Sequence, residues 1–160
     1  MNQPYEETFD GVTTPRLAPG PRHELICARL HAILGACLIG IPSTRLLPPR
    51  DEVRVSPTTT LRPDLALVAQ ATGKLWLAVE IISSDDHRTD TVIKKQIYED
   101  IRIPRLWMID PRYDNLEVYQ CGPYGLALKA ILAGREQLTE SLLPQLSLVV
   151  ADLFAADTAN

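Results

Sequence analysis

The sequence predicts an α/β or α+β fold with a mixed sheet. Three observations favour it: an amphipathic helical pattern early in the chain, strand-forming runs through the middle, and a second helical segment that separates those runs. The order helix, strands, helix, strands is typical of a sheet covered by helices. With 160 residues, 46% of them apolar, the chain has the size of one globular domain, so we expect a single domain over 1–160.

The first part of the chain is extended and then helical. Residues 1–21 contain four prolines and little periodicity, so we expect an extended lead-in with no more than one short strand. The first strong element is a helix from His23 to Ile39, in which apolar residues recur at helical spacing. Prolines then break the chain into short extended pieces, among which 50–56 is a candidate polar strand.

The middle of the chain reads as a hairpin followed by a helix. The predicted strands Leu61–Ala69 and Leu75–Ile82 flank a small turn that contains Gly73. A polar stretch then leads into a helix that continues to about Ile101 and is ended by Pro104. Four elements complete the prediction: strands at 105–110, 116–121 and 126–133, and a strand end or short helix within the segment LPQLSLVVADLF.

Composition limits the binding partners and the cellular compartment that we expect. The 16 Lys and Arg against 20 Asp and Glu give a net charge of −4, which weakly repels a polyanion and argues against tight nucleic-acid binding. The sequence shows no long apolar run and no basic-then-apolar start, so we expect a cytoplasmic protein with no membrane partner. The cysteines and histidines are scattered, which predicts neither a disulfide framework nor a zinc site.

Two carboxylates meet in the predicted hairpin. If its turn has three residues with Gly73 in the left-handed conformation, Leu65 faces Val79 and Asp64 faces Glu80. Side chains opposite each other in an antiparallel pair lie about 5 Å apart, where like charges are destabilising. Both faces of this hairpin are mostly apolar, so the acidic pair needs a cation or a raised pKa.

A divalent metal ion is one solution to this conflict. Asp64, Glu80, a main-chain carbonyl and waters would form an all-oxygen site, which selects Mg²⁺ or Mn²⁺ over zinc. Two alternatives stay open. A basic side chain would neutralise the pair as a structural ion cluster, or a two-residue turn would shift the register by one residue. The basic candidates are Arg62, Arg88 and Lys94.

The second helix adds a cation to this prediction. Asp90, Lys94 and Tyr98 repeat at four-residue intervals and share one face beside an apolar stripe of isoleucines. The amine of Lys94 would then extend back toward Glu80. A metal ion with an ammonium group provides the electrostatics that phosphodiester hydrolysis requires. The plainer interpretation is that Asp90 and Lys94 form an exposed ion pair worth a few tenths of a kcal/mol.

Taken together, these residues resemble the Uma-two family of endonucleases, a branch of the PD-(D/E)XK restriction-endonuclease-like superfamily. The resemblance covers almost the whole chain, and its combined pattern is specific although each piece is short. Its segments are Tyr5-Glu6, Asp10-Gly11, His23, Pro63-Asp64, Glu80-Ile81-Ile82-Ser83, Asp90, Lys94, Tyr98, Trp107-Met108-Ile109-Asp110-Pro111, Glu117-Val118-Tyr119 and Leu143-Pro144-x-Leu146-x-Leu148.

The resemblance implies a restriction-endonuclease-like mixed β-sheet flanked by α-helices. It implies catalytic Asp64, Glu80 and Lys94, with the metal held by Asp64, Glu80 and the main-chain carbonyl of Ile81. Asp90 and Tyr98 would orient the lysine and the substrate. The chain departs from the pattern at Ile82, where the wider superfamily has its lysine, at Ser83-Ser84, where Ser-Pro is usual, and at Val12, where glutamate is common.

The leading hypothesis is a Mg²⁺-dependent (or Mn²⁺-dependent) endodeoxyribonuclease with DNA as its substrate. Superfamily members often dimerise, so the resemblance also implies a homodimer. The alternatives are an inactive module on the same fold that binds a protein or nucleic acid, and hydrolysis of another phosphate ester. We expect Glu24 to be solvated and Trp76 and Trp107 to lie in the core. Arginines that would line a DNA groove are Arg45, Arg50, Arg54, Arg62 and Arg88.

Overall fold

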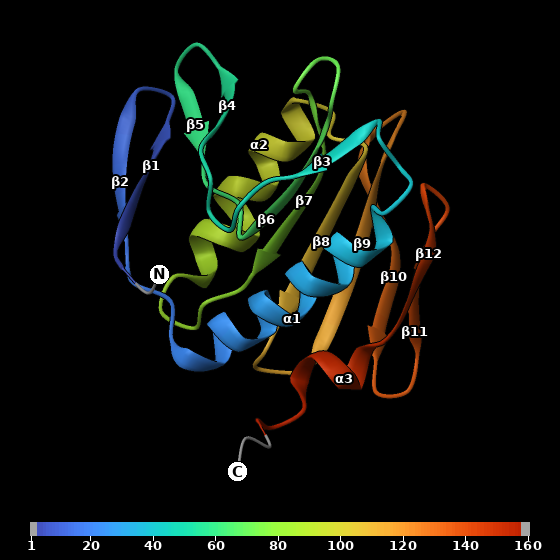
Figure 1. Ribbon diagram of the computed structural model, residues 1–160. Coiled ribbons are helices and arrows are strands. Elements are labelled where there is room, and N and C mark those ends of the chain that lie inside the picture. The colour runs from blue at the N-terminus through green and yellow to red at the C-terminus, as the bar shows by residue number, and fades with distance from the viewer. Residues whose placement is uncertain (1–2, 158–160) are drawn as a thin grey trace.

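A six-stranded mixed sheet forms the centre of the molecule. The structure, a computed structural model, describes residues 3–157 (Figure 1). The strand order is β10-β9-β8-β7-β6-β3, in which β7 and β8 run parallel and the other neighbours antiparallel. The predicted mixed α/β fold is therefore confirmed. The strands are β3 (Thr44–Leu46), β6 (Leu65–Ala69), β7 (Leu75–Ile81), β8 (Arg105–Asp110), β9 (Asn115–Gly122) and β10 (Gly125–Ala133).

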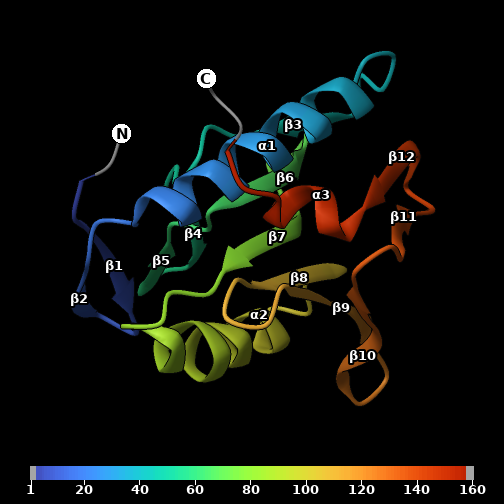
Figure 2. The same cartoon turned by 90° about the horizontal axis from the view of Figure 1, so that it is seen from below.

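Helices cover both faces of this sheet (Figure 2). Helices α1 (Pro21–Cys37) and α3 (Val150–Phe154) lie on one side. A π-helical segment, η1 (Thr89–Lys94), continues into α2 (Lys95–Asp100) on the other side. The strands serve both layers because alternate side chains point to opposite faces. Leu65, Leu67 and Leu77 pack with α1, whereas Ala66, Val68 and Ala78 belong to a second core with Tyr98 of α2.

Two smaller sheets complete the fold. Four short strands form the order β2-β1-β5-β4 beside the central sheet: β1 (Tyr5–Phe9), β2 (Val12–Arg16), β4 (Val53–Ser56) and β5 (Thr59–Leu61). Strand β11 (Gln137–Glu140), which we did not predict, pairs with β12 (Leu143–Val149). Among the described residues, no helix combines the length and apolar character that crossing a bilayer requires.

The N-terminal segment differs from the expected lead-in. Residues 5–16 form the antiparallel hairpin β1–β2, whose turn residues Asp10 and Gly11 have φ of 50° and 84°. Positive φ at both positions is typical of a two-residue Asp-Gly hairpin turn. Pro15 is compatible with this hairpin because β2 is an edge strand, where a missing N–H costs no ladder hydrogen bond.

Most other elements lie near their predicted positions, with two instructive differences. The strand predicted at Leu61–Ala69 is divided between β5 and β6, because Pro63 lacks the N–H that a continuous ladder requires. In the hairpin β6–β7, Leu65 pairs with Val79 as predicted, and Gly73 has φ of 70°. Beyond Leu67 a bulge shifts the register, so Val68 pairs with Leu75.

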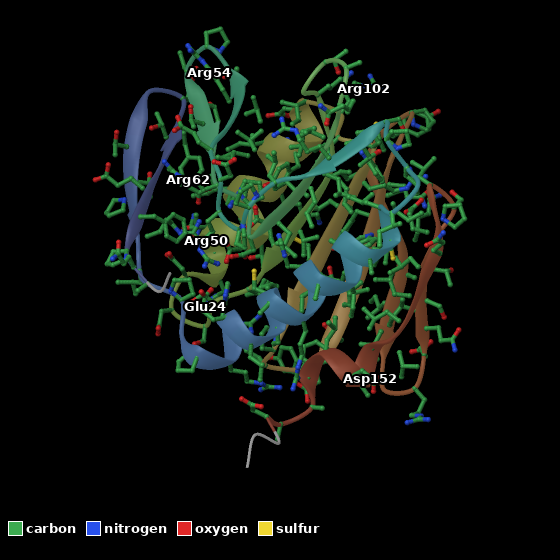
Figure 3. The ribbon with its side chains drawn as sticks, viewed as in Figure 1. Glu24, Arg50, Arg54, Arg62, Arg102 and Asp152 are labelled. Atoms are coloured by element: carbon green, nitrogen blue, oxygen red, sulfur yellow. The ribbon has the colours of Figure 1, made fainter. Side chains whose placement is uncertain are left out.

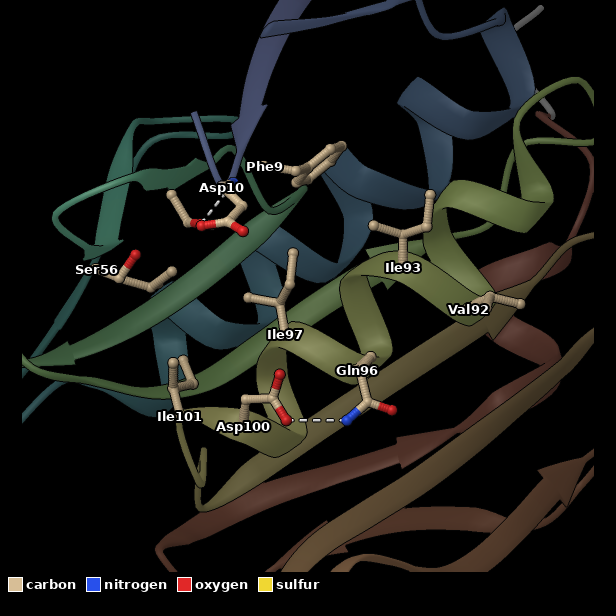
Figure 4. Close-up of a pocket in the computed structure, with 11 residues that line it drawn as sticks. Phe9, Asp10, Ser56, Val92, Ile93, Gln96, Ile97, Asp100 and Ile101 are labelled. Atoms are coloured by element: carbon tan, nitrogen blue, oxygen red, sulfur yellow. Dashed lines mark hydrogen bonds between the residues drawn. The ribbon is translucent and has the colours of Figure 1, made fainter. Parts of the chain in front are cut away.

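The second helix places its polar face inward. Asp90 and Lys94 are 2% and 0% exposed, so the exposed ion pair considered from the sequence is wrong. By contrast Ile93 is 40% exposed. The isoleucine stripe lines an open hollow of about 660 Å³ together with Phe9 and Val55 (Figure 4). The burial of a lysine and an aspartate requires charged partners inside the molecule.

Candidate active site

Asp64 lies at the start of β6, in a shell of hydrogen-bond donors. It precedes the strand by one residue and is 3% exposed. The N–H of Ile81 donates to its Oδ2 over 2.8 Å. Its Oδ1 lies 3.2 Å from Nη1 of Arg50 and 3.3 Å from Nε2 of His23. These contacts bring Asp64 directly against the peptide that joins Glu80 to Ile81.

The donors around Asp64 favour its ionised form. Burial acts to raise its pKa, but the hydrogen bond and charge of His23 and the N–H of Ile81 outweigh burial and hold that pKa below its usual value. The same contact shifts the pKa of the His23 imidazole upward. Burial lowers the pKa of His23, but the hydrogen bond and charge of Asp64 dominate, and its pKa lies above the usual value. Asp64 is therefore a carboxylate over the whole neutral range.

Glu80 faces the other layer of the molecule. Its Oε1 lies 2.6 Å from Nζ of Lys94 and accepts a hydrogen bond from the hydroxyl of Tyr98. Burial, and after it the nearby Asp90 and Asp64, raise the pKa of Glu80 to about 8 although Lys94 lowers it. Glu80 therefore holds its proton to higher pH than an ordinary glutamate does.

Lys94 is fully buried between two carboxylates. Besides Glu80, its ammonium contacts Oε2 of Glu7 over 2.9 Å. Burial lowers the pKa of Lys94, but Glu80, Glu7 and Asp90 raise it above the usual value, so the amine stays protonated. Its role is thus that of a fixed positive charge. The sequence predicted that the amine of Lys94 extends toward Glu80, and the structure shows this contact. The alternative that the contact is a structural ion pair was also open from the sequence.

A second ionic layer encloses Lys94, and sequence reasoning missed it. Arg16 of β2 pairs with Glu7, and its Nη2 and Nε lie 2.7 Å from Asp90 and Asp86. Glu7 also accepts the N–H of Arg62 over 2.7 Å. The Asp-Gly dipeptide could have predicted the hairpin that carries Glu7 and Arg16, but not that these side chains reach Lys94.

Arg50 is the second missed neighbour. Its guanidinium joins Asp64 to Oε1 of Glu24, which lies 2.7 Å from Nη2, and Glu24 is only 26% exposed in its side chain. The expectation of a solvated Glu24 is therefore wrong, because Arg50 holds it at the site (Figure 3). Arg62, an expected partner of the acidic pair, instead donates to the carbonyl of Arg50 and pairs with Glu52.

A small hollow adjoins Asp64. This hollow of about 10 Å³ is bounded by Asp64, Ile81 and His23, among others, which is close to the volume one water needs. Nε2 of His23 lies 3.0 Å from the carbonyl oxygen of Ile81. Within residues 3–157 no three His, Cys, Asp or Glu side chains form a ready metal cluster. The predicted set contains two such side chains and one carbonyl, so its donors fit Mg²⁺ or Mn²⁺.

The remaining predictions concern the aromatic residues. Trp107 is 0% exposed and Trp76 packs against the same core, so both belong to the core as expected. Tyr98 is also fully buried, with its hydroxyl on Glu80. Burial, followed by the charge and hydrogen bond of Glu80, raises the pKa of Tyr98 well above its usual value, so the phenol remains a donor.

Comparison with known proteins gives a consistent result. The Uma2 family, described as "Putative restriction endonuclease", matches residues 2–151. A crystal structure from Anabaena variabilis, described as "a putative nuclease belonging to DUF820", is 16% identical and superposes with a TM-score of 0.77 over 93% of this chain and 89% of its own. At that identity the likeness shows the fold alone. No curated protein matches this sequence.

Proposed function

The chain belongs to the Uma2 family of restriction-endonuclease-like proteins, and from that premise we propose that it is a metal-dependent endonuclease that hydrolyses phosphodiester bonds of DNA. One observation supports this most strongly. Asp64 contacts the peptide beside Glu80, at a small hollow that Ile81 also lines, and a buried ammonium lies beside Glu80.

In this proposal Asp64, Glu80 and the carbonyl of Ile81 hold Mg²⁺ or Mn²⁺. The ion supplies Lewis acidity, polarising the phosphate and lowering the pKa of a water. Asp64 contributes a carboxylate that is already ionised and fixed by the N–H of Ile81. Glu80 must lose its proton to become a full ligand.

Lys94 supplies positive charge for the transition state. Because its amine stays protonated between Glu80 and Glu7, it stabilises the negative charge that develops on phosphate oxygens and does not act as a base. Tyr98 and Asp90 position it: the phenol donates to the same oxygen of Glu80, and Asp90 holds Arg16 beside Glu7.

The charge balance sets how tightly DNA binds. A net charge of −4 opposes a polyanion, and Arg50 is occupied by Asp64 and Glu24. Arg62 and Arg54 extend from the site toward the tip of the β4–β5 hairpin (Figure 3) and remain candidates for phosphate contacts. We expect weak binding that depends strongly on salt.

Plasmid nicking tests the proposal. Purified protein is incubated with supercoiled plasmid and with single-stranded DNA in Mg²⁺ or Mn²⁺, and in EDTA. The proposal predicts metal-dependent nicking that Asp64→Ala abolishes and that the exposed substitution Asp152→Asn on α3 leaves intact. Equal nicking by Asp64→Ala protein, or none by wild type, would sink the proposal.

A second candidate function is a non-catalytic module on the same fold. It is favoured by the protein cations already on both carboxylates, Arg50 on Asp64 and Lys94 on Glu80. Calorimetry separates the two functions. The nuclease binds Mn²⁺ in a manner that Glu80→Ala abolishes, whereas a module whose carboxylates are structural ion pairs shows no such binding.

A further inference from the structure

A third hollow opens on the face of the central sheet that carries Glu80. Its volume is about 350 Å³, within the roughly 300–1,000 Å³ of small-ligand pockets. Its walls come from β8, β9, the turn between them and the helix that carries Lys94. Two segments singled out in the sequence, 107–111 and 117–119, contribute residues to it, although neither supplies a proposed metal ligand.

The register places this hollow beside the candidate active site. Glu80 pairs with Met108, and Met108 pairs with Glu117, so the three side chains lie in a row on one face. Adjacent strands are about 4.8 Å apart, which puts Glu117 about 10 Å from Glu80 at the backbone. Ile82 and Lys95, which also line the hollow, each follow a proposed site residue in the chain. A DNA strand with one phosphate at the site therefore has a neighbouring nucleotide over the hollow.

The walls of the hollow suit a planar ring. Ile82 and Met108 are buried apolar side chains at its base. Tyr113 stands in the β8–β9 turn with 70% of its surface exposed and the guanidinium of Arg112 5.4 Å from its ring centroid. Tyr119 is buried and carries the ammonium of Lys95 over its ring at 4.5 Å. Tyr113 is therefore the aromatic ring that is available for stacking, and an aromatic ring with a neighbouring cation is a common platform for bases in single-stranded nucleic acid.

The polar groups of the hollow suit the edge of an uncharged base. Asp110 is neutralised by Arg112 over 2.9 Å, and the carboxylate of Glu117 accepts the hydroxyl of Tyr119. With Lys95 the hollow thus contains two acidic and two basic side chains, which gives a phosphate little advantage. A base, which carries no charge, is accommodated without that penalty.

One atom in the hollow lacks a partner. Oδ1 of Asn115 is buried and has no hydrogen-bond partner among the described residues. An unsatisfied buried acceptor costs about 1–3 kcal/mol, so a ligand that donates to it is favoured. Glu117, two residues along the same strand face, offers further acceptor oxygens. The hollow therefore presents acceptors, which match the exocyclic amino group of adenine, cytosine or guanine.

The geometry points to a binding site for one unpaired, amino-bearing nucleobase, next to the phosphate that is cut. The inference rests on the proposed nuclease function and deepens it, since it makes single-stranded or locally opened DNA the preferred substrate. Thymine has no exocyclic amine and is the poorest occupant.

Fluorescence anisotropy tests this with labelled homopolymers of deoxyadenosine, deoxycytidine and thymidine, in Ca²⁺ so that binding is read without cleavage. We expect wild type to bind the adenine and cytosine strands more tightly than the thymine strand. Asn115→Ala reduces that preference. Tyr113→Ala weakens binding of all three strands by about fivefold or more, while Tyr124→Ala, at a fully exposed tyrosine outside the hollow, leaves it unchanged.

The outcomes separate this inference from the proposed function. Equal binding of the three strands by wild type, with Tyr113→Ala matching Tyr124→Ala, overturns the base site even if plasmid nicking succeeds. Base preference that Asn115→Ala removes, in a protein that fails to cut DNA in Mg²⁺, keeps the base site and rejects the nuclease. Tyr113 lies on an exposed turn, so its variant remains informative if Asn115→Ala fails to fold.

Discussion

The two carboxylates of the candidate site are held in opposite electrostatic states. Asp64 is surrounded by donors, the N–H of Ile81, His23 and Arg50, and its pKa lies below the usual value. Glu80 is more deeply enclosed among other acids, and burial raises its pKa to about 8 despite Lys94. Two side chains of the same chemical class thus differ because the donors around Asp64 outweigh its burial, whereas at Glu80 burial and the neighbouring acids outweigh Lys94.

This difference indicates how such a site tolerates its own charge. A pair of ionised carboxylates at close range inside a protein is destabilising. Here the Asp64 carboxylate is stabilised by donors, while the Glu80 carboxyl group either pairs with Lys94 or keeps a proton. In the proposed site, a metal ion would meet one ligand that is already ionised, Asp64, and one that must first lose its proton, Glu80. The predictions below test Asp64 and Glu80 separately.

The largest expected effect is the loss of stability when Glu80 loses its buried cation. Lys94→Met leaves Glu7 and Glu80 buried without their shared cation, and breaking a buried ion pair costs about 3–5 kcal/mol of unfolding free energy. Urea denaturation measures it. The control is Lys95→Met, at the next and partly exposed position, which changes stability by less than about 0.5 kcal/mol. Equal stability of the two variants would show that Lys94 is not an essential buried cation.

The next effect is on the nicking rate when Asp64 loses its charge. Asp64→Asn keeps an acceptor for the N–H of Ile81 but removes the prepared charge. Loss of a metal ligand should lower the nicking rate by more than the roughly 10–100-fold typical of residues that only support a ligand. The loss should be the same at pH 6 and pH 9, because Asp64 is ionised at both. A rate within threefold of wild type would remove Asp64 from the proposed site.

A smaller effect is the dependence of Mn²⁺ affinity on pH. Because Glu80 holds its proton up to a pKa of about 8, Mn²⁺ must displace that proton at neutral pH. The apparent Mn²⁺ affinity should therefore rise by up to about tenfold per pH unit below that value and level off above it. Calorimetry in buffers of different ionisation enthalpy would detect the released proton. Glu80→Gln protein that still released a proton would assign it to another group.

A related effect is on the pH dependence of the stability of the metal-free protein. Between the ordinary glutamate pKa of 4.5 and the folded value of about 8, the folded state binds a proton that the unfolded state has lost. Unfolding free energy therefore falls as pH rises through this window, by at most about 1.4 kcal/mol per pH unit for this one proton. Thermal unfolding of wild type and Glu80→Gln in EDTA should show a shallower fall in the variant. Parallel curves would contradict a raised Glu80 pKa.

The fold was largely predictable from local patterns. The hairpin around Gly73, the helix after His23 and the strand Arg105–Asp110 follow from periodicity and turn residues, and the structure places them within a few residues. The hairpin at 5–16 was missed because its prolines outweighed the Asp-Gly turn signal. Strand β11 was missed because only four residues form it.

The site was predictable only in part. Asp64, Glu80 and Lys94 follow from hairpin register and helix spacing, which are local. Glu7, Arg16 and Arg50 reach the site from segments far apart in the sequence, and no local pattern indicates that they converge. Arg50 adopts a φ of 55°, a conformation unusual for arginine, which also has no signal in the sequence.

The most direct test of the central claim is a crystal structure of the protein soaked with Mn²⁺, with anomalous scattering to locate the ion. The account predicts one strong peak bound by Asp64, the carbonyl of Ile81 and Glu80, with Lys94 still beside Glu80, and no peak in Asp64→Asn crystals. A fully soaked crystal without a peak there, with Arg50 and Lys94 unchanged on the two carboxylates, would contradict it.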